Sequence, residues 1–339
     1  MESENVKNVS PPIRSVYECE NADKIPILFM FEGLSGCGKS YLAETLVTRR
    51  NGEYKKPITH SSDALREELY GDVNDQSHNG ELFNELHKRI KDDLRNGNDV
   101  IYDATNINKK RRKAFLSELT HIDCHKVCIC VLTPYEVCLQ QNQNRERKVP
   151  DEVIRRMYLN WCPPSLDEGF DNIVLAYNYG NIDRSRYTLE NFFEGEVNAN
   201  TIDQENSHHK ATIGIHCLEA AEYIKEHYPN NLALRTAALL HDIGKPFTKS
   251  RLNSRGEVDT ECHYYNHQNC GSYDSFFYLD VLSVPQNERL HIANLIYYHM
   301  MPFTSWKQSK SVERRVRIQV GENFYNEIMQ LHEADLAAH

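Results

Sequence analysis

The chain has 339 residues, of which 40% are hydrophobic and 26% are charged, and its formal net charge is −10. This length suffices for about two domains, no apolar run reaches the ~20 residues of a membrane span, and the N-terminus lacks the basic and apolar regions of a signal peptide. We therefore expect a cytoplasmic protein with no membrane association. Its ten scattered cysteines favour free thiols, and its acidity argues against a surface that coats nucleic acid, although local recognition of a strand end stays open.

The chain divides into four segments. Residues 1–24 are polar and predict a tail, and residues 25–180 alternate strand-like and helical runs, which is typical of an α/β domain with a parallel sheet flanked by helices. Residues 181–206 are polar and aperiodic and indicate a linker, and residues 207–339 predict an all-α domain. The expected strands are 26–32, 57–61, 98–103, 124–132 and 171–177, and the expected helices are 39–50, 80–96, 108–120, 134–142, 150–160, 213–224, 232–241, 272–282 and 288–300.

The most specific motif is G-x-x-x-x-G-K-S, which directly follows an apolar strand-like run. Gly33, Gly36 and Gly38 allow the backbone to wrap around a phosphate with its N–H groups pointing inward. Lys39 would reach the β- and γ-phosphates of ATP, and the Ser40 hydroxyl would bind Mg²⁺. The strand before the motif and the helical run after it disfavour an accidental glycine-rich turn.

Polar residues follow the next two strands. Asp63 lies at the carboxyl edge of the sheet and could accept the proton of an attacking hydroxyl, or it could instead be a helix N-cap. Arg66 is three residues further on and could hold an acceptor phosphate. Asp103 ends the third strand, where a carboxylate organises Mg²⁺, and Asn106 could orient that carboxylate or a phosphate.

Two arginines precede the helix that Pro150 and Asp151 open. On a lid, Arg145 and Arg147 would neutralise charge that develops on a transferred phosphoryl group. Taken singly, each could be a surface charge. We assign Arg147 to nucleotide binding, and the sequence leaves the division of roles between the two arginines open.

The motifs GLSGCGKS, SSDALR, DATNINKKRR, NRERKVPDEVIRRM and PPSLDEGFD arrive in this order within residues 26–178. Together they resemble the kinase domain of bacteriophage-type polynucleotide kinases, which phosphorylate 5′-hydroxyl ends of RNA or DNA. The roles that this resemblance implies are ATP and Mg²⁺ binding for Lys39 and Ser40, general base for Asp63, acceptor-phosphate binding for Arg66, and lid arginine for Arg145.

A second motif, A-L-L-H-D-I-G-K-P, closes an apolar helical run in the C-terminal half. The adjacent His241 and Asp242 can present one nitrogen and one oxygen to the same divalent cation. His263 and His267 have the spacing i, i+4, which would place both on one face of a helix. Any single histidine is more simply a satisfied core or surface imidazole, but an ordered set indicates a metal site. The further members of that set are His216, His299 and Asp335.

This ordered set resembles the HD-domain phosphohydrolase superfamily over residues 208–339. In that superfamily helices contribute H…HD…D to a metal site that acts on phosphate esters. Mixed imidazole and carboxylate ligation suits Mn²⁺, Ni²⁺, Co²⁺ or Fe²⁺, among which the sequence does not choose. The resemblance implies His216, His241, Asp242 and Asp335 as core metal ligands, Lys245 as a phosphate contact, and His263, His267 and His299 as a second metal position or phosphate site.

A 5′-hydroxyl kinase joined to a phosphohydrolase suggests an end-healing enzyme for RNA or DNA. The first half would add a 5′-phosphate, and the second would remove a 2′,3′-cyclic, 2′- or 3′-phosphate, which prepares the strand for a separate ligase. Two alternatives remain. One is a nucleoside or metabolite kinase fused to a nucleotidase, and the other is a regulatory nucleotide sensor without phosphoryl transfer.

Overall fold

The computed structural model describes residues 16–18, 25–50, 52–206 and 210–338, which divide between two compact units. The first unit comprises Met1–Ile154 and Pro164–Asn181, and the second comprises Arg155–Pro163 and Ile182–His339. The tail expected over residues 1–24 lies largely outside the described residues. Within it, Val16–Glu18 form strand β1.

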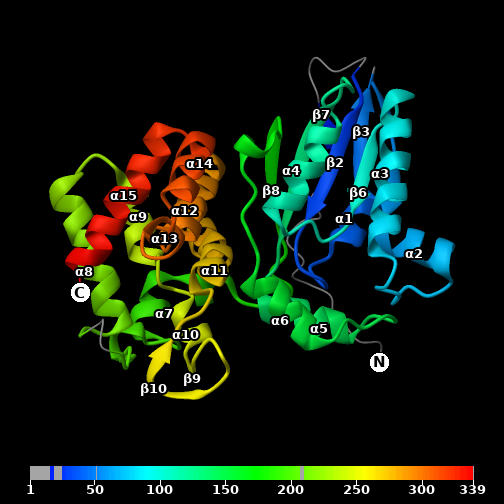
Figure 1. Cartoon of the computed structure of the whole chain (residues 1–339). Coiled ribbons are helices and arrows are strands. Elements are labelled where there is room, and N and C mark those ends of the chain that lie inside the picture. The colour runs from blue at the N-terminus through cyan, green and yellow to red at the C-terminus, as the bar shows by residue number, and fades with distance from the viewer. Residues whose placement is uncertain (1–15, 19–24, 51, 207–209, 339) are drawn as a thin grey trace, which may run out of the picture. The chain divides into compact units, whose positions relative to one another are not determined.

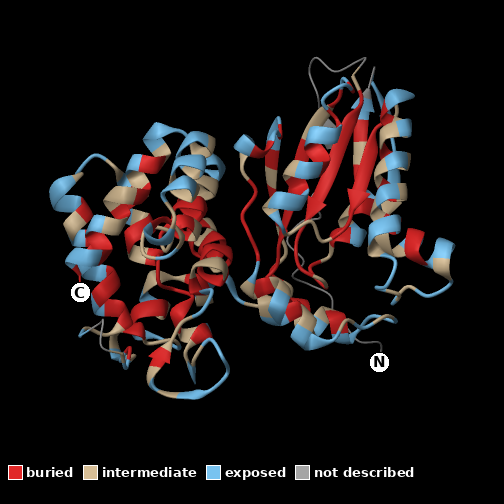
Figure 2. Ribbon diagram, in the orientation of Figure 1, coloured by how far each residue is buried: buried red, intermediate tan, exposed pale blue. Residues whose placement is uncertain are grey.

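The first unit is built on a five-stranded parallel sheet with the strand order β5-β6-β2-β7-β8 (Figure 1). The first of these strands in the chain, β2, is fully buried at the centre of the sheet, as its unbroken apolar run requires (Figure 2). Loops that leave the carboxyl ends of β2, β5 and β6 therefore meet at one edge. The bounds are β2 Ile27–Glu32, β5 Ile58–Ser61, β6 Val100–Asp103, β7 His125–Leu132 and β8 Asn172–Tyr177.

Helices flank this sheet, as the alternating pattern predicted. Helix α3 shows why they form where they do: it buries Leu82, Leu86, Ile90 and Leu94, spaced by four, and packs that stripe on β5 and β6. The helices of this part of the chain are α1 Lys39–Thr45, α2 Ser62–Tyr70, α3 Asn79–Arg95, α4 Lys109–Glu118, α5 Tyr135–Gln143 and α6 Asp151–Leu159, with the 3₁₀ helix η1 at Leu166–Glu168.

The helix expected over residues 39–50 is shorter than predicted. It ends at Thr45, and β3 (Val47–Arg50) follows, paired with β1 and with β4 (Glu53–Lys55). β-branched residues favour a strand here, and the buried hydroxyl of Thr48 donates to Asp99 Oδ2 at 2.8 Å, a contact 51 positions away. Tertiary pairing therefore overrides the helical pattern of the run.

The second unit is mainly helical, as predicted. α8 packs against α9 and α15, and α12 packs against α9 and α11, around a core of apolar faces. Among the described residues, no helix combines the length and apolar character that crossing a bilayer requires. The helices are α8 Ile213–His227, α9 Leu232–Leu240, α10 Lys245–Thr248, α11 His267–Val281, α12 Gln286–Tyr298, α13 Ser305–Gln308, α14 Lys310–Val320 and α15 Glu322–Ala337.

One prediction about this half was wrong. The segment 181–206 is not a bare linker, because η2 (Arg184–Tyr187), α7 (Leu189–Glu194) and η3 (Ala199–Thr201) lie in it and belong to the second unit. The helical run is also interrupted by an antiparallel hairpin of β9 (Ser250–Leu252) and β10 (Val258–His263).

Candidate functional site

The loop between β2 and α1 has the backbone that its glycines predicted. Gly36 and Gly38 adopt φ angles of 84° and 96°, in the left-handed region. A Cβ at Gly36 would stand 2.3 Å from the Cys138 carbonyl oxygen, and one at Gly33 would stand 2.7 Å from that of Val131. Side chains are excluded at both positions, so the loop can keep the close turn that exposes its N–H groups to a phosphate.

Lys39 and Ser40 open α1 from this loop. The buried ammonium of Lys39 donates to the carbonyl oxygens of Gly33 at 2.9 Å and Leu34 at 2.7 Å, so its charge lies over the loop. Ser40 Oγ donates to Asp103 Oδ2 at 3.1 Å. The hydroxyl and carboxylate that would hold Mg²⁺ are therefore adjacent, although 63 positions separate them in the chain.

The pKa of the Asp103 carboxyl responds to several charged residues nearby. Burial raises the pKa of the Asp103 carboxyl, while the charge of Lys39 and the hydrogen bond from Ser40 lower it. Asp63 raises this pKa further, and Arg145 lowers it. The carboxyl edge of the sheet thus brings the nucleotide residues, the predicted base and one lid arginine into a single electrostatic environment.

Asp63 lies in the first turn of α2, but it is not the N-cap. Ser61 is the cap, since its hydroxyl accepts from the backbone N–H of Asp63 and Ala64. The Asp63 carboxylate instead accepts from Arg66 Nη1 at 3.0 Å, and it also pairs with Arg147 Nη1. With its side chain 47% exposed, Asp63 remains open to an acceptor hydroxyl.

Arg66 is buried although it is charged. Its Nη2 donates to Asn79 Oδ1 at 3.0 Å, and its Nε has no hydrogen-bond partner among the described residues. The Nε atom is itself buried, so Arg66 contributes its positive charge beside the predicted base, which favours an acceptor that bears a phosphate.

The lid arginines have different surroundings. Arg147 pairs with Asp63 and donates from Nε to Asn74 Oδ1 at 3.2 Å, whereas the charge of Arg145 acts on Asp103. The loop that carries both is closed by Asn142, whose side chain donates to Val149 O at 2.7 Å and accepts from Val149 N at 2.9 Å. Sequence reasoning missed Asn142, because an interior helical asparagine carries no local signal.

Asn106, which is predicted to orient Asp103 or a phosphate, lies in the loop after β6. Its Nδ2 donates to Phe31 O at 2.8 Å, and its own carbonyl accepts from Arg112 Nη1 at 3.0 Å. Arg112 in turn makes two hydrogen bonds of 2.7 Å to Glu168, and both of these side chains are fully buried. Asn106 therefore ties the end of β2 to this ion pair.

The second candidate site lies inside the helical unit. Two groups of ligand atoms each lie within 4.8 Å of one another, namely His216, His241 and Asp242, and Asp242, His267 and His299. Asp335 Oδ1 lies 3.1 Å from His216 Nε2, which joins it to the first group. All six residues are buried. The six residues lie on, or directly after, five different helices, namely α8, α9, α11, α12 and α15.

The histidines of these groups share one arrangement. Each Nδ1 lies 2.6–3.0 Å from a backbone carbonyl oxygen, which can only accept, so each Nδ1 carries the hydrogen. The Nε2 lone pairs then face one another, at 3.1 Å between His216 and His241 and at 3.1 Å between His267 and His299. Burial lowers the pKa of His299 to about 3, which keeps it neutral. Convergent lone pairs repel unless a cation lies between them, so this donor set fits divalent metal ions.

His263 does not join this site. It ends β10 while His267 begins α11, so the predicted shared helix face is wrong, because the two residues lie in different elements with a turn between them. His263 Nε2 lies 3.0 Å from Asp259 Oδ2, and its ring stacks on Tyr265. Neither metal-ligand group found among the described residues contains His263.

Lys245 lies beside the metal ligands, as expected. Its Nζ lies 2.6 Å from Asp242 Oδ2 and donates to Gln204 Oε1 at 2.7 Å. Burial would raise the pKa of Asp242, but the adjacent positive charge of Lys245 lowers it, and that pKa lies well below its usual range. Sequence reasoning missed the fully buried Gln204, since it lies in the segment interpreted as a linker.

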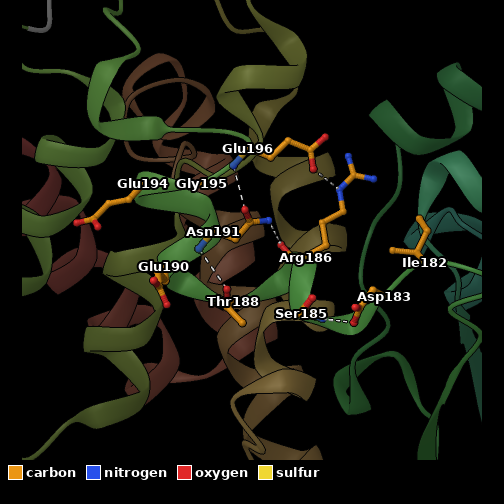
Figure 3. A pocket seen from close by; sticks show the side chains of 10 residues that line it. All are labelled: Ile182, Asp183, Ser185, Arg186, Thr188, Glu190, Asn191, Glu194, Gly195 and Glu196. Carbon is orange, nitrogen blue, oxygen red and sulfur yellow. Dashed lines mark hydrogen bonds and ion pairs between the residues drawn. The ribbon is translucent and has the colours of Figure 1, made fainter.

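A further hollow of about 680 Å³ lies on the η2–α7 segment (Figure 3). Arg186 pairs with Glu196 at 3.4 Å, and Asn191 bonds to the backbone of both, so these polar groups satisfy one another. None of the ten residues that line this hollow is a predicted site residue. We therefore place the candidate chemistry at the two sites above.

Comparison with known proteins finds two separate family matches. Residues 28–164 match the family described as AAA domain, and residues 213–320 match the family described as HD domain. The chain is 26% identical over 145 residues to the L-seryl-tRNA(Sec) kinase of Methanococcus maripaludis, an alignment that covers 43% of this chain and 56% of that relative. It thus spans about half the length of this curated relative.

A solved structure of a candidate kinase from Chloroflexus aurantiacus is similar with a TM-score of 0.36 and 16% identity, covering 45% of this chain and 86% of that one. From its two family matches, the protein has a kinase-like P-loop domain followed by a helical HD domain. The first implies ATP and a divalent cation, and the second implies a metal at the His/Asp groups.

Proposed function

We propose that the protein is a bifunctional nucleic-acid end-healing enzyme. Its first half would phosphorylate 5′-hydroxyl ends with ATP, and its second half would remove a 2′,3′-cyclic, 2′- or 3′-phosphate. The observation that carries this proposal is Asp63, a partly exposed carboxylate held between Arg66 and Arg147 at the edge of a nucleotide site. A hydroxyl acceptor that also bears a phosphate satisfies all three groups, and a polynucleotide 5′ end has this chemistry.

The kinase residues act as follows. The Asp63 carboxylate accepts the proton of the attacking 5′-hydroxyl while the oxygen forms its bond to the γ-phosphorus of ATP, and the bond from that phosphorus to the β,γ-bridging oxygen breaks to release ADP. Arg66 lies beside Asp63 and attracts the neighbouring phosphate of the strand by its positive charge, and Arg145 neutralises charge on the transferred group. Mg²⁺ held by Ser40 and Asp103 would supply further neutralisation of the β- and γ-phosphates.

The HD half contributes a preorganised donor set. Backbone carbonyls fix each imidazole with Nε2 directed inward, and Lys245 offers an ammonium to a phosphate oxygen beside Asp242. Divalent cations bound there would supply Lewis-acid chemistry for hydrolysis of a phosphate ester. The product ends, a 5′-phosphate and a 3′-hydroxyl, are those that a separate ligase consumes.

A second candidate function is supported by the seryl-tRNA kinase relative. Its name indicates a hydroxyl acceptor on an aminoacyl group of RNA, and a free nucleoside or metabolite would need the same base and nucleotide site. The two arginines beside Asp63 favour an acceptor with a phosphate nearby, which a free nucleoside lacks.

The test is the intact mass of a short RNA with a 5′-hydroxyl and a 2′,3′-cyclic phosphate after incubation with protein, ATP, Mg²⁺ and Mn²⁺. We expect a gained 5′-phosphate that Lys39→Ala abolishes and a lost 3′-phosphate that Asp242→Asn abolishes, each variant sparing the other reaction. Adenosine, adenosine 3′-monophosphate and seryl-tRNA are offered in parallel as acceptors.

Matched controls are Lys88→Ala, on an exposed face of α3, and Glu222→Gln, on an exposed face of α8. Both should retain both reactions. If the RNA is unchanged and adenosine is phosphorylated, the end-healing proposal is wrong, and the protein is a nucleoside kinase. If instead Lys39→Ala leaves every activity intact, the nucleotide site has a regulatory role.

A further inference from the structure

The turn between β10 and α11 displays an aromatic pair. The rings of His263 and Tyr265 lie nearly parallel, with centroids 5.3 Å apart and an interplanar angle of 10°. Tyr265 is 47% exposed, and the side chain of His263 is 26% exposed. With so much of its surface in solvent, Tyr265 contributes little to the core, although an exposed phenol ring is available for stacking.

This pair is attached directly to the metal site. The Tyr264 carbonyl oxygen accepts from Nδ1 of His267, a ligand of the second metal group, at 2.7 Å. Lys245 Nζ lies 5.5 Å from the centroid of the Tyr264 ring. Tyr265 is two positions before His267, so their Cα atoms are at most about 7.6 Å apart.

Two side-chain contacts and one backbone turn fix the conformation of the segment that carries the pair. Tyr264 Oη donates to Gln204 O at 2.7 Å, His263 Nε2 lies 3.0 Å from Asp259 Oδ2, and Asn266 turns the chain with a φ of 63°. The exposed ring of Tyr265 and the partly exposed ring of His263 therefore lie on a fixed turn close to a metal ligand in the chain, which is the arrangement that a recognition surface needs.

We propose that His263 and Tyr265 form the stacking platform for the base of the nucleotide whose phosphate enters the HD metal site. This inference rests on the proposed phosphohydrolase function and specifies its substrate, a phosphate ester that carries a nucleobase. In a nucleotide, one ribose separates the base from the phosphate. This short separation suits a platform residue, Tyr265, that lies two positions from the metal ligand His267 in the chain. Stacking on an aromatic face accepts every base, so strands of any end sequence would bind.

The test compares two substrates that share a phosphate ester but differ in the base. Tyr265→Ala should raise the KM for an oligoribonucleotide ending in a 3′-phosphate about tenfold, because one stacked base is lost, while kcat changes little. Hydrolysis of glycerol 2-phosphate, which carries no ring that could stack, should be unchanged. Tyr265→Trp should restore the nucleotide KM, and Tyr54→Ala, an exposed tyrosine on β4, is the control without effect.

His263→Ala separates stacking from metal binding. We expect a raised nucleotide KM with an unchanged metal content per chain, measured by inductively coupled plasma mass spectrometry. A loss of metal, or an equal loss of activity on both substrates, would overturn the platform.

Direct binding distinguishes failure of the platform from failure of the phosphohydrolase function. If the wild type hydrolyses no phosphate ester, the proposed activity fails, and calorimetric titration with adenosine 3′-monophosphorothioate still tests the platform. Weaker binding by Tyr265→Ala than by wild type and Tyr265→Trp supports it, whereas equal binding by all three contradicts it.

Discussion

Asp242 gives one carboxylate oxygen to each of the two metal-ligand groups. Its Oδ2 lies 3.4 Å from His216 Nε2, and its Oδ1 lies 3.2 Å from His267 Nε2. We therefore expect Asp242→Asn to lower the metal content of both positions, whereas His267→Gln should affect only the second. Metal counting on protein loaded with Mn²⁺ checks this, and equal counts in the two variants would contradict a shared carboxylate.

The Arg112–Glu168 pair gives a residue-scale prediction of stability. Glu168→Gln leaves a guanidinium buried without its counter-charge, which should destabilise the first unit by about 3–5 kcal/mol. Denaturant unfolding followed by far-UV circular dichroism measures the change. Asp92→Asn breaks an exposed ion pair with Arg95 and should shift the midpoint little, and a comparable loss in both variants would refute the argument.

At the scale of elements, the lid is the loop between Asn142 and Val149, and hydrogen bonds between these two residues join its ends. Asn142→Ala removes both hydrogen bonds to Val149, so the arginines between these positions lose their fixed placement. At about 1 kcal/mol for each bond, we expect a loss of roughly tenfold or more in kcat/KM for phosphorylation. Phosphohydrolase activity should not change.

Steady-state kinetics with ATP and the best acceptor provides the measurement. Gln143→Ala, at the neighbouring exposed position, is the matched control, since its side chain makes one bond of 3.2 Å to Asp151. Normal kinetics in Asn142→Ala would mean that the lid keeps its conformation by other contacts.

At the scale of the whole molecule, the second unit begins before the sheet of the first is complete. Residues Arg155–Pro163 belong to it, although β8 of the first unit follows them in the chain. Trp161 shows why, because its ring is fully buried against Tyr273 and Phe276, and its carbonyl accepts from Asn269 Nδ2 at 2.9 Å. A boundary drawn at residue 181 or 206 therefore cuts through a core.

Trp161→Ala should destabilise the helical unit by about 3–5 kcal/mol and leave the sheet unit stable. Hydrogen exchange should show faster exchange in α11 and unchanged protection in β2. A fragment of residues 182–339 should lack cooperative unfolding for the same reason. Leu166→Ala, at a side chain 57% exposed, is the control. Equal protection of α11 in Trp161→Ala and the wild type would contradict the assignment of this segment.

Local patterns predicted much of this protein. The five strands of the main sheet, the glycine loop and helices such as α3, α4, α8, α9 and α12 follow from signals that lie within a few residues, and the structure confirmed them with small shifts of their ends, whereas α14 and α15 were not predicted as separate helices. The ordered histidines and aspartates could be recognised because all of them except His263 lie on a helix or next to the end of one. The structure brings all of them except His263 together.

What the sequence by itself determined is therefore the identity of the elements and the residue types at their ends, because backbone preference and apolar periodicity act locally. Only the tertiary structure decided that His263 stacks on Tyr265, that Ser61 caps α2 and frees Asp63, and that residues 155–163 join the second unit. Packing and long-range hydrogen bonds select among conformations that local preference leaves nearly equal in free energy.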